Sequence, residues 1–175
     1  KPAKVSYGGP AMKAKASRIA VLVLATLDTK SEEVSYIKAR IEEEGLDVFI
    51  IDTGIMGEPR GVVPNISAAE TAEAAGTNLE VLRRKGIRGE AVREMLKGAS
   101  AVTARAFQEG KIHGAIALGG AEGAVMAAAA MQVLPPGFPK LIITPLASGN
   151  RTFGPFVGLR DITVMHSLVD IAGIN

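Results

Sequence analysis

The sequence has no cysteine and no tryptophan among its 175 residues, and only 4% of them are aromatic. The absence of cysteine excludes disulfide bonds and thiolate metal sites, which leaves Asp, Glu and two histidines as metal ligands. Because aromatic side chains are so few, the core has to be built from Ala, Val, Leu and Ile. A chain without cysteine is compatible with a reducing cytoplasm, where we expect the protein.

The chain also lacks a long hydrophobic run and a large excess of one charge. No run reaches the roughly 18 apolar residues that a membrane helix needs. The formal net charge is +2, and the basic residues are interspersed with acidic ones, which is not typical of a nucleic-acid surface. We therefore expect neither a membrane nor a nucleic acid as a partner.

The residues that are present favour one folded domain. Apolar residues make up 47% of the chain and charged residues 22%, which is typical of an α/β protein. Residues 1–17 carry basic side chains but no apolar segment of a signal peptide, so we interpret them as a flexible leader or an expression remnant. A single α/β domain is expected over residues 18–175.

Apolar runs alternate with amphipathic segments along this domain. The apolar runs predict strands at residues 18–25, 46–52, 113–118, 140–144 and 161–165. The other segments predict a helix ending at Gly45, short helices at 67–75 and 79–85, and longer ones at 88–109 and 122–133. This alternation predicts a doubly wound, mostly parallel sheet with helices on both faces, a Rossmann-like fold of three layers.

The most informative stretch joins a strand to an alanine-rich helix through a glycine-rich turn. Gly119, Gly120 and Gly123 lie in this turn, between the runs at 113–118 and 122–133. The first N–H groups of a helix lack partners and the helix dipole adds positive charge there, so the turn predicts binding of a phosphate or carboxylate. The alternative is that the glycines only permit a tight turn and close helix packing.

Other strand ends carry hydroxyl, glycine or charged residues as well. In a doubly wound sheet, ligands bind beyond the carboxyl ends of the strands, where the connecting loops converge. The first strand is followed by Thr26, Asp28, Thr29 and Lys30, the second by residues 52–54, and the fourth by Ser148, Gly149 and Asn150. We expect these loops to form one composite site for a nucleotide or another phosphate-bearing small molecule.

The residues of these loops have several possible roles, some structural and some in ligand binding. Thr29 and Glu32 match a capping box, so Thr29 could merely cap a helix. Lys30 would be opposed by the dipole of that helix, and a phosphate nearby would explain its position. Asp28 could orient Lys30, bind a ribose hydroxyl or hold Mg²⁺ through water. Residues 148–150 are also an ordinary turn sequence.

The sequence does not assign a reaction. The fingerprint G-x-G-x-x-G does not follow the first strand and no P-loop motif occurs, which argues against an ordinary NAD enzyme or P-loop NTPase. His166 and Asp170 could face one way on a helix, but no cysteine or serine motif completes a catalytic triad with them.

Five segments together carry a family resemblance. They are ATLDTKSEE, LDVFIIDTGIMGEP, EGKIHGAIALGGAEG, VLPPGFPKLIITPLASGN and VGLRDITVMHSLVDIAGIN. In order and spacing they resemble the Tm-1-like ATP-binding domain family, UPF0261, over nearly all of residues 18–175. Members of that family have a second α/β domain, so the resemblance implies that this chain is the N-terminal half of a two-domain protein.

The resemblance implies a ligand as well as a fold. It implies ATP, allows Mg²⁺ beside it, and makes a homo-oligomer, a dimer, plausible. By position it implies that the ligand contacts the loop at 26–30, the glycine turn at 119–123 and residues 148–150. Half of an enzyme acting on a small phosphorylated or carboxylated metabolite, or a protein-interaction module, are the alternative functions.

One part of the sequence departs from the family pattern. The family's turn reads like Gly-Gly-Ser-Gly-Gly-Thr, whereas here Ala121, Glu122 and Ala124 replace the serine, a glycine and the threonine. Two hydroxyl groups are lost and a carboxylate is added where phosphates would lie. Glu122 would repel a phosphate unless a metal ion intervenes, or it could itself cap the helix dipole.

Overall fold

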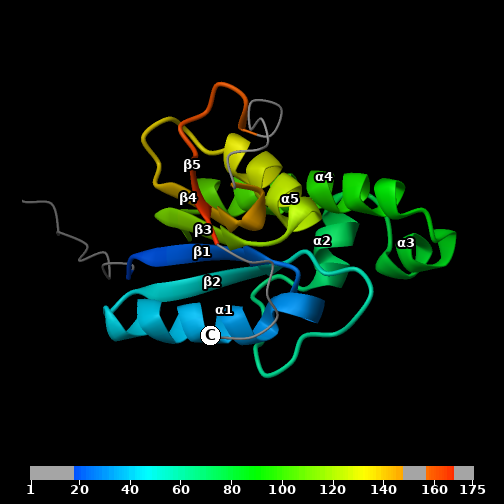
Figure 1. Cartoon of the computed structure of the whole chain (residues 1–175), viewed down its shortest axis with the longest axis horizontal. Coiled ribbons are helices and arrows are strands. Elements are labelled where there is room, and N and C mark those ends of the chain that lie inside the picture. Colours follow the sequence, from blue (N-terminus) through cyan, green and yellow to red (C-terminus); the bar gives the residue numbers. More distant parts are fainter. Residues whose placement is uncertain (1–17, 148–156, 168–175) are drawn as a thin grey trace, which may run out of the picture.

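The computed structural model describes residues 18–147 and 157–167. The predictions for residues 1–17, residues 148–150 and Asp170 therefore concern positions outside the described residues. The described chain forms one sheet of five parallel strands in the order β2-β1-β3-β4-β5 (Figure 1). The strands are β1 Ala20–Ala25, β2 Asp47–Asp52, β3 Gly114–Leu118, β4 Lys140–Thr144 and β5 Thr163–His166.

Helices connect these strands and cover both faces of the sheet. They are α1 Leu27–Glu43, α2 Ala68–Ala74, α3 Leu79–Lys85, α4 Arg88–Gln108 and α5 Ala121–Gln132, with a short 3₁₀ helix η1 at Pro145–Ala147. In Figure 1, α1 lies on one side of the sheet and α4 and α5 lie on the other. The predicted doubly wound, Rossmann-like fold is confirmed.

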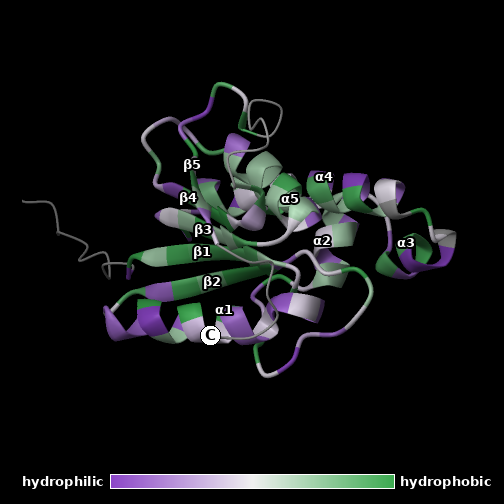
Figure 2. Cartoon of the chain, viewed as in Figure 1, coloured by the Kyte–Doolittle hydropathy of each residue, from purple (hydrophilic) through white to green (hydrophobic). Residues whose placement is uncertain are grey.

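The central strand β1 is apolar throughout because both of its faces are buried. Leu22 and Leu24 pack in the cluster that includes the inner faces of α4 and α5. Val23 and Ala25 point to the opposite face and pack with Val34 of α1. Successive side chains of a strand alternate between faces, so a strand covered on both sides needs an uninterrupted apolar run. Figure 2 shows the same pattern, with hydrophobic strands between helices whose outer sides are hydrophilic.

The strand order creates a switch point between β1 and β3. The chain leaves β1 toward β2 on one side, and after α2, α3 and α4 it returns to β3 on the other side of β1. The loops that follow β1 and β3 therefore diverge to opposite faces of the sheet, which leaves a crevice at the carboxyl edge. Of all places in such a fold, this crevice is where ligands bind most often.

Helix α1 begins earlier than the capping box at Thr29 predicts. Its N-cap is Thr26, and the first turn is followed by a kink at Lys30, where φ is −122° and ψ is 17°. The cause is tertiary: the carboxylate of Asp52, at the end of β2, accepts a hydrogen bond from the N–H of Leu27 at 3.0 Å. The alternative interpretation of Thr29 as the cap is therefore wrong, and residues 27–30 belong to the first turn of α1 and not to a loop.

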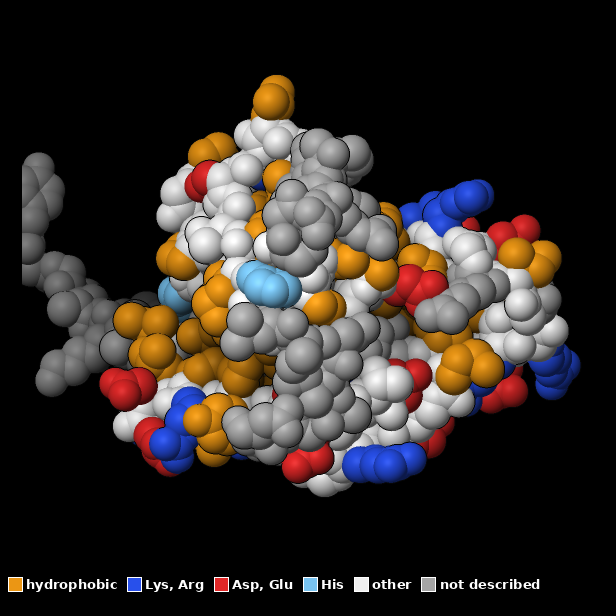
Figure 3. All heavy atoms as spheres, in the orientation of Figure 1, with side chains coloured by type: hydrophobic (Ala, Val, Ile, Leu, Met, Phe, Trp, Pro, Cys, Tyr) orange, Lys and Arg blue, Asp and Glu red, His pale blue; other side chains and the backbone are white. Residues whose placement is uncertain are grey.

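None of the helices in the described part of the chain combines the length and the apolar character needed to cross a bilayer. On the face seen in Figure 3, positive and negative side chains are interspersed over α1 and α3 and do not segregate by sign.

Candidate functional site

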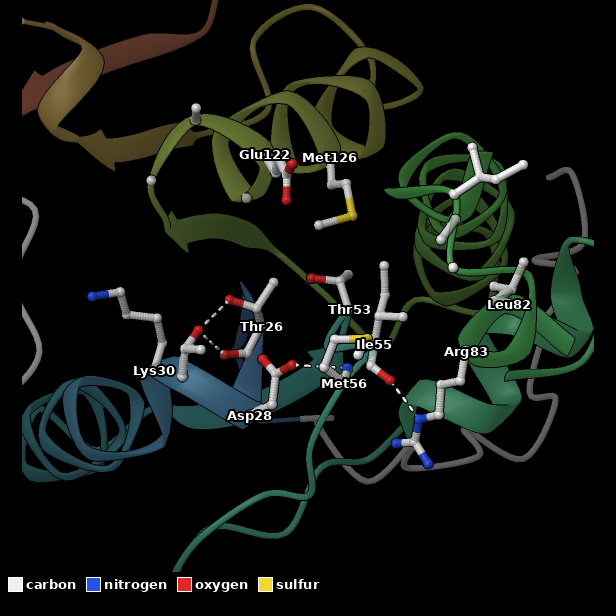
Figure 4. A pocket seen from close by; sticks show the side chains of 17 residues that line it. Thr26, Asp28, Lys30, Thr53, Ile55, Met56, Leu82, Arg83, Glu122 and Met126 are labelled. Atoms are coloured by element: carbon white, nitrogen blue, oxygen red, sulfur yellow. Dashed lines mark hydrogen bonds between the residues drawn. The ribbon is translucent and has the colours of Figure 1, made fainter. Parts of the chain in front are cut away.

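A cavity of about 870 Å³ lies at the carboxyl edge of the sheet, at the switch point. It is lined by the start of α1, by the loops after β2 and β3, by the junction of α3 and α4, and by the first turns of α5 (Figure 4). The lining residues are Thr26, Asp28, Thr29, Lys30, Thr53, Ile55, Met56, Leu82, Arg83, Gly86, Ile87, Ala91, Gly120, Ala121, Glu122, Gly123 and Met126. The strand order thus brings three loops together that are far apart in the sequence.

Most of the described residues that the sequence singled out lie in this cavity. The four candidates after β1 line it, and so do Gly120 and Gly123 of the glycine turn. Gly119 is buried beside the cavity but is not among its lining residues. Residues 148–150 lie outside the described part of the chain, so their place relative to the cavity stays a prediction.

The glycine turn is shaped by close packing at one position and is open at another. A Cβ at Gly119 would lie 2.8 Å from the Cα of Gly123, which leaves no room for a side chain. At Gly123 the nearest atom to a Cβ would be the carbonyl oxygen of Leu118 at 3.7 Å, an ordinary contact. The packing interpretation therefore accounts for Gly119 but does not account for Gly123.

The N-terminus of α5 faces the cavity without a side-chain cap. Its N-cap residue is Gly120, which has no side chain to accept a hydrogen bond from the first turn. The next three residues, Ala121, Glu122 and Gly123, all line the cavity. First-turn N–H groups have no partners within their own helix, so they present hydrogen-bond donors and a positive dipole end at this wall.

Two carboxylates meet behind the loop after β1. Asp52 is only 2% exposed, and its Oδ1 accepts hydrogen bonds from the N–H of Leu27 at 3.0 Å and of Gly54 at 2.8 Å. Burial raises the pKa of Asp52 above 3.8, and these two backbone N–H groups oppose the rise. Asp28 accepts a hydrogen bond from the N–H of Met56 through Oδ2, at 3.1 Å, while its buried Oδ1 has no hydrogen-bond partner.

A glycine allows these carboxylates to lie close together. A Cβ at Gly54 would lie 3.0 Å from Oδ1 of Asp52 and 3.1 Å from Oδ1 of Asp28. A Cβ at this position would press on both carboxylates, which would have to shift by a few tenths of an ångström to accept it.

The two basic side chains that line the cavity are both engaged by carboxylates. Lys30 Nζ lies 3.0 Å from Oε1 of Glu33, and the two side chains are only 15% and 17% exposed. This ion pair gives Lys30 a structural partner, and a contact of Lys30 with a phosphate stays a prediction. Arg83 donates hydrogen bonds to the carbonyl of Ile55 at 2.5 Å and to Glu58 at 3.1 Å. Arg83 therefore joins α3 to the loop after β2.

Two threonine hydroxyl groups and the carboxylate of Glu122 also lie at this side of the cavity. The hydroxyl of Thr29 donates to the carbonyl of Thr26 at 3.2 Å, and the two threonine hydroxyl oxygens are 3.0 Å apart. In Figure 4 the carboxylate of Glu122 points from α5 into the cavity, toward the side on which Thr53, Thr26 and Asp28 lie. We call this region, with Lys30 and the first turn of α5, the polar end.

Sequence reasoning missed the opposite side of the cavity. Neither the junction of α3 and α4 nor Met126 had any chemical pattern that marked it as part of a site. The one available signal was Met56, an apolar residue in a loop that is otherwise rich in glycine and proline. Its side chain is 77% exposed in the structure.

The two histidines lie apart from the lining residues. His113 accepts a hydrogen bond from the N–H of Ala20 at 3.2 Å through Nδ1, which is a structural role at the start of the sheet. His166 ends β5, and its Nδ1 is buried without a hydrogen-bond partner.

One family model and two bacterial proteins that match this chain all carry the name UPF0261. A family model described as "Uncharacterised protein family (UPF0261) N-terminal domain" matches residues 19–175. A UPF0261 protein of Clostridium tetani is 44% identical over 155 residues, covering 89% of this chain and 38% of that protein. A UPF0261 protein of Brucella suis is 37% identical over 127 residues, covering 73% of this chain and 30% of that protein.

A plant protein is also similar. The ToMV susceptible protein tm-1(GCR26) of Solanum lycopersicum is 29% identical over 170 residues, covering 89% of this chain and 22% of that protein. The chain thus spans 22–38% of the length of these three relatives.

Proposed function

The chain belongs to the UPF0261 family, whose N-terminal domain it matches, and on this premise we propose that it binds a nucleotide such as ATP in the cavity at the switch point. The observation that carries the proposal is the convergence of the uncapped N-terminus of α5 with the start of α1 and the loop after β2 on one cavity. Nucleotide phosphates bind where unpaired backbone N–H groups and a helix dipole point into a crevice of this kind.

The phosphates belong at the polar end. The first turn of α5 offers backbone donors there, and Thr26 and Thr29 add hydroxyl groups. Lys30 lies in the same region and supplies a cation, which exchanges part of its interaction with Glu33 for the phosphate. A charge-assisted hydrogen bond of this kind is stronger than one between neutral groups.

Mg²⁺ fits this arrangement when it arrives with the phosphates. Asp28 has a buried Oδ1 without a hydrogen-bond partner, and Glu122 points into the cavity from the other side. Among the described residues, no group of three or more His, Cys, Asp and Glu side chains could hold a metal ion by itself. Mg²⁺ is commonly held by one or two carboxylates together with phosphate oxygens and water, so Asp28 and Glu122 would supply the protein ligands.

Calorimetric titration of the 175-residue chain with ATP tests the proposal, with and without Mg²⁺. We expect saturable heat, and tighter binding when Mg²⁺ screens Asp28 and Glu122 from the phosphates. Absence of heat at millimolar ATP in both conditions would contradict the proposal.

Replacement of one lysine links the binding to the cavity. We expect Lys30→Met to weaken ATP binding by roughly tenfold, because a hydrogen bond to a charged group contributes about 1.5 kcal/mol. Lys38→Met is the matched control, since Lys38 pairs with Glu42 on the outer side of the same helix and does not line the cavity. Equal affinities of the two variants would place the ligand elsewhere.

A further inference from the structure

The side of the cavity that faces the polar end is apolar. Ile55 and Met56 come from the loop after β2, Leu82 and Ile87 from α3 and the start of α4, and Met126 from α5. We call these five side chains the apolar wall. In Figure 4, Met126 extends from α5 toward Ile55 and Met56, which lie on the opposite side of the cavity. The apolar wall therefore has side chains on both sides of the cavity.

The side chains of the apolar wall differ in their exposure to solvent. Met126 and Leu82 are buried in the core, with exposed fractions of 2% and 3%. Met56 and Ile87 are 77% and 55% exposed, although they line a cavity. Exposed apolar surface is unfavourable in water, so a ligand with an apolar part would gain free energy by covering these two side chains.

Hydrogen-bonding groups of this wall are largely committed within the protein. The N–H of Met56 donates to Asp28, and the carbonyl of Ile55 accepts from Arg83. The carbonyl of Ile87 accepts two N–H groups from the first turn of α4. The guanidinium of Arg83 is itself occupied by Ile55 and Glu58. The wall thus presents apolar contact surface with few groups that could read the edge of a ligand.

We propose that the apolar wall holds the flat ring of the nucleotide base against its exposed side chains, Met56 and Ile87, without reading the edge of the ring. This inference rests on the proposed binding of a nucleotide at the polar end. A flat ring would remove apolar area of these two side chains from water, and a thioether sulfur such as that of Met56 makes favourable contacts with aromatic rings. The volume of about 870 Å³ also exceeds what phosphates alone require and lies within the usual range for pockets of small organic ligands.

Affinity should therefore follow the area of the ring and not the identity of the base. We expect ATP and GTP to bind with dissociation constants within about threefold of each other, since both carry a purine. CTP, with its smaller ring, should bind more weakly, and inorganic triphosphate, which has no ring, should bind most weakly.

Competition titrations with these four compounds and one pair of variants test the inference. Met56→Ala removes an exposed side chain of the wall and should weaken ATP binding by roughly fivefold while leaving inorganic triphosphate unchanged. Val63→Ala is the matched control, because Val63 is an 87% exposed residue of the same loop that does not line the cavity. It should leave both affinities unchanged.

The outcomes separate this inference from the proposed function. Triphosphate binding as tight as that of ATP, or a preference for one purine of about thirtyfold or more, would overturn the apolar wall as a base site and leave phosphate binding intact. If neither ATP nor triphosphate binds, the proposed function fails and the base site fails with it.

Discussion

Glu122 has two opposite effects at the polar end of the cavity. As an acidic residue in the first turn of α5, it interacts favourably with the positive end of the helix dipole. The same carboxylate points into the cavity, where it repels any phosphate that binds at this helix terminus. Its net contribution therefore depends on whether a ligand is bound.

This conflict predicts opposite shifts in stability and affinity. Glu122→Gln should lower the free energy of unfolding of the ligand-free protein by about 0.3–1 kcal/mol, because a favourable dipole interaction is lost. In the absence of Mg²⁺ it should strengthen ATP binding by roughly threefold to tenfold, because a like charge is removed. Denaturant unfolding and calorimetry measure the two quantities. Weaker ATP binding by the variant would show that Glu122 contacts the ligand as a hydrogen-bond acceptor.

Several site residues could be predicted from the sequence because their chemistry is visible locally. A glycine-rich turn before a helix, and hydroxyl or charged residues after a strand, are patterns of adjacent residues. Their partners are of two kinds. Lys30 pairs with Glu33, three residues further along the same helix, whereas the carboxylate of Asp52 at the end of β2 accepts a hydrogen bond from Leu27, which follows the neighbouring strand β1. The second contact depends on the pairing of β1 with β2, which no local pattern contains.

At the scale of elements, the crossing of α2 and α4 depends on one glycine. A Cβ at Gly98 of α4 would lie 1.9 Å from the carbonyl oxygen of Thr71 in α2. Thr71 in turn donates its hydroxyl to the carbonyl of Asp52 at the end of β2, at 2.9 Å. The close approach of α4 thus fixes α2 against the strand end that borders the cavity.

Substitution of this glycine should be far more harmful than substitution of another in the same helix. We expect Gly98→Ala to lower the free energy of unfolding by at least about 2 kcal/mol, because the clash is with backbone atoms and one helix has to move. Gly89→Ala should raise it by up to about 1 kcal/mol, since no atom lies within 4 Å of the added Cβ and alanine favours helix. Thermal or denaturant unfolding compares them; a stable Gly98→Ala variant would contradict this account of the crossing.

The elements themselves agree with the sequence within a few residues, except at the start of α1. Strands and helices follow hydrophobic periodicity, which is a property of short stretches of chain. The start of α1 was mispredicted because the capping signal at Thr29 is local, whereas the acceptor that sets the true start, Asp52, comes from another strand. Local signals fail where a distant residue supplies a better partner.

At the scale of the whole molecule, one ion pair joins β4 to the segment that leads into β5. The side chain of Lys140 is fully buried, and its Nζ lies 2.7 Å from Oδ1 of Asp161 and 2.8 Å from the carbonyl oxygen of Pro135. Asp161 also accepts a hydrogen bond from the N–H of Gly137 at 2.7 Å. The hydrogen bond from Lys140, with that from Gly137, lowers the pKa of Asp161 from 3.8 to about 2.

This lowered pKa predicts an acid-dependent contribution to stability. A carboxyl group whose pKa is lowered in the folded state stabilises the protein fully above its unfolded pKa of 3.8, and this contribution is lost as the pH falls toward about 2. Asp161→Asn should therefore be less stable than the parent at neutral pH, and the difference should shrink between about pH 5 and about pH 2.

Unfolding curves across this pH range measure the difference directly. Asp47→Asn is the control, because it removes an exposed ion pair with Arg18 at 3.3 Å that should contribute little. A gap between the parent and Asp161→Asn that stays constant down to the lowest pH would exclude the proposed linkage.

The sequence by itself determined the class of fold, the family and the polar residues of the candidate site. Apolar runs alternating with amphipathic segments predict a parallel doubly wound sheet, because backbone geometry repeats every two or 3.6 residues. The match to UPF0261 and the similarity to the tm-1 protein confirm the family resemblance drawn from motif order.

Only the tertiary structure decided which segments line the cavity. The strand order β2-β1-β3 brings residues 26–30, 53–56 and 120–123 together and sets the apolar wall opposite them, because contacts between distant segments depend on how the strands pair.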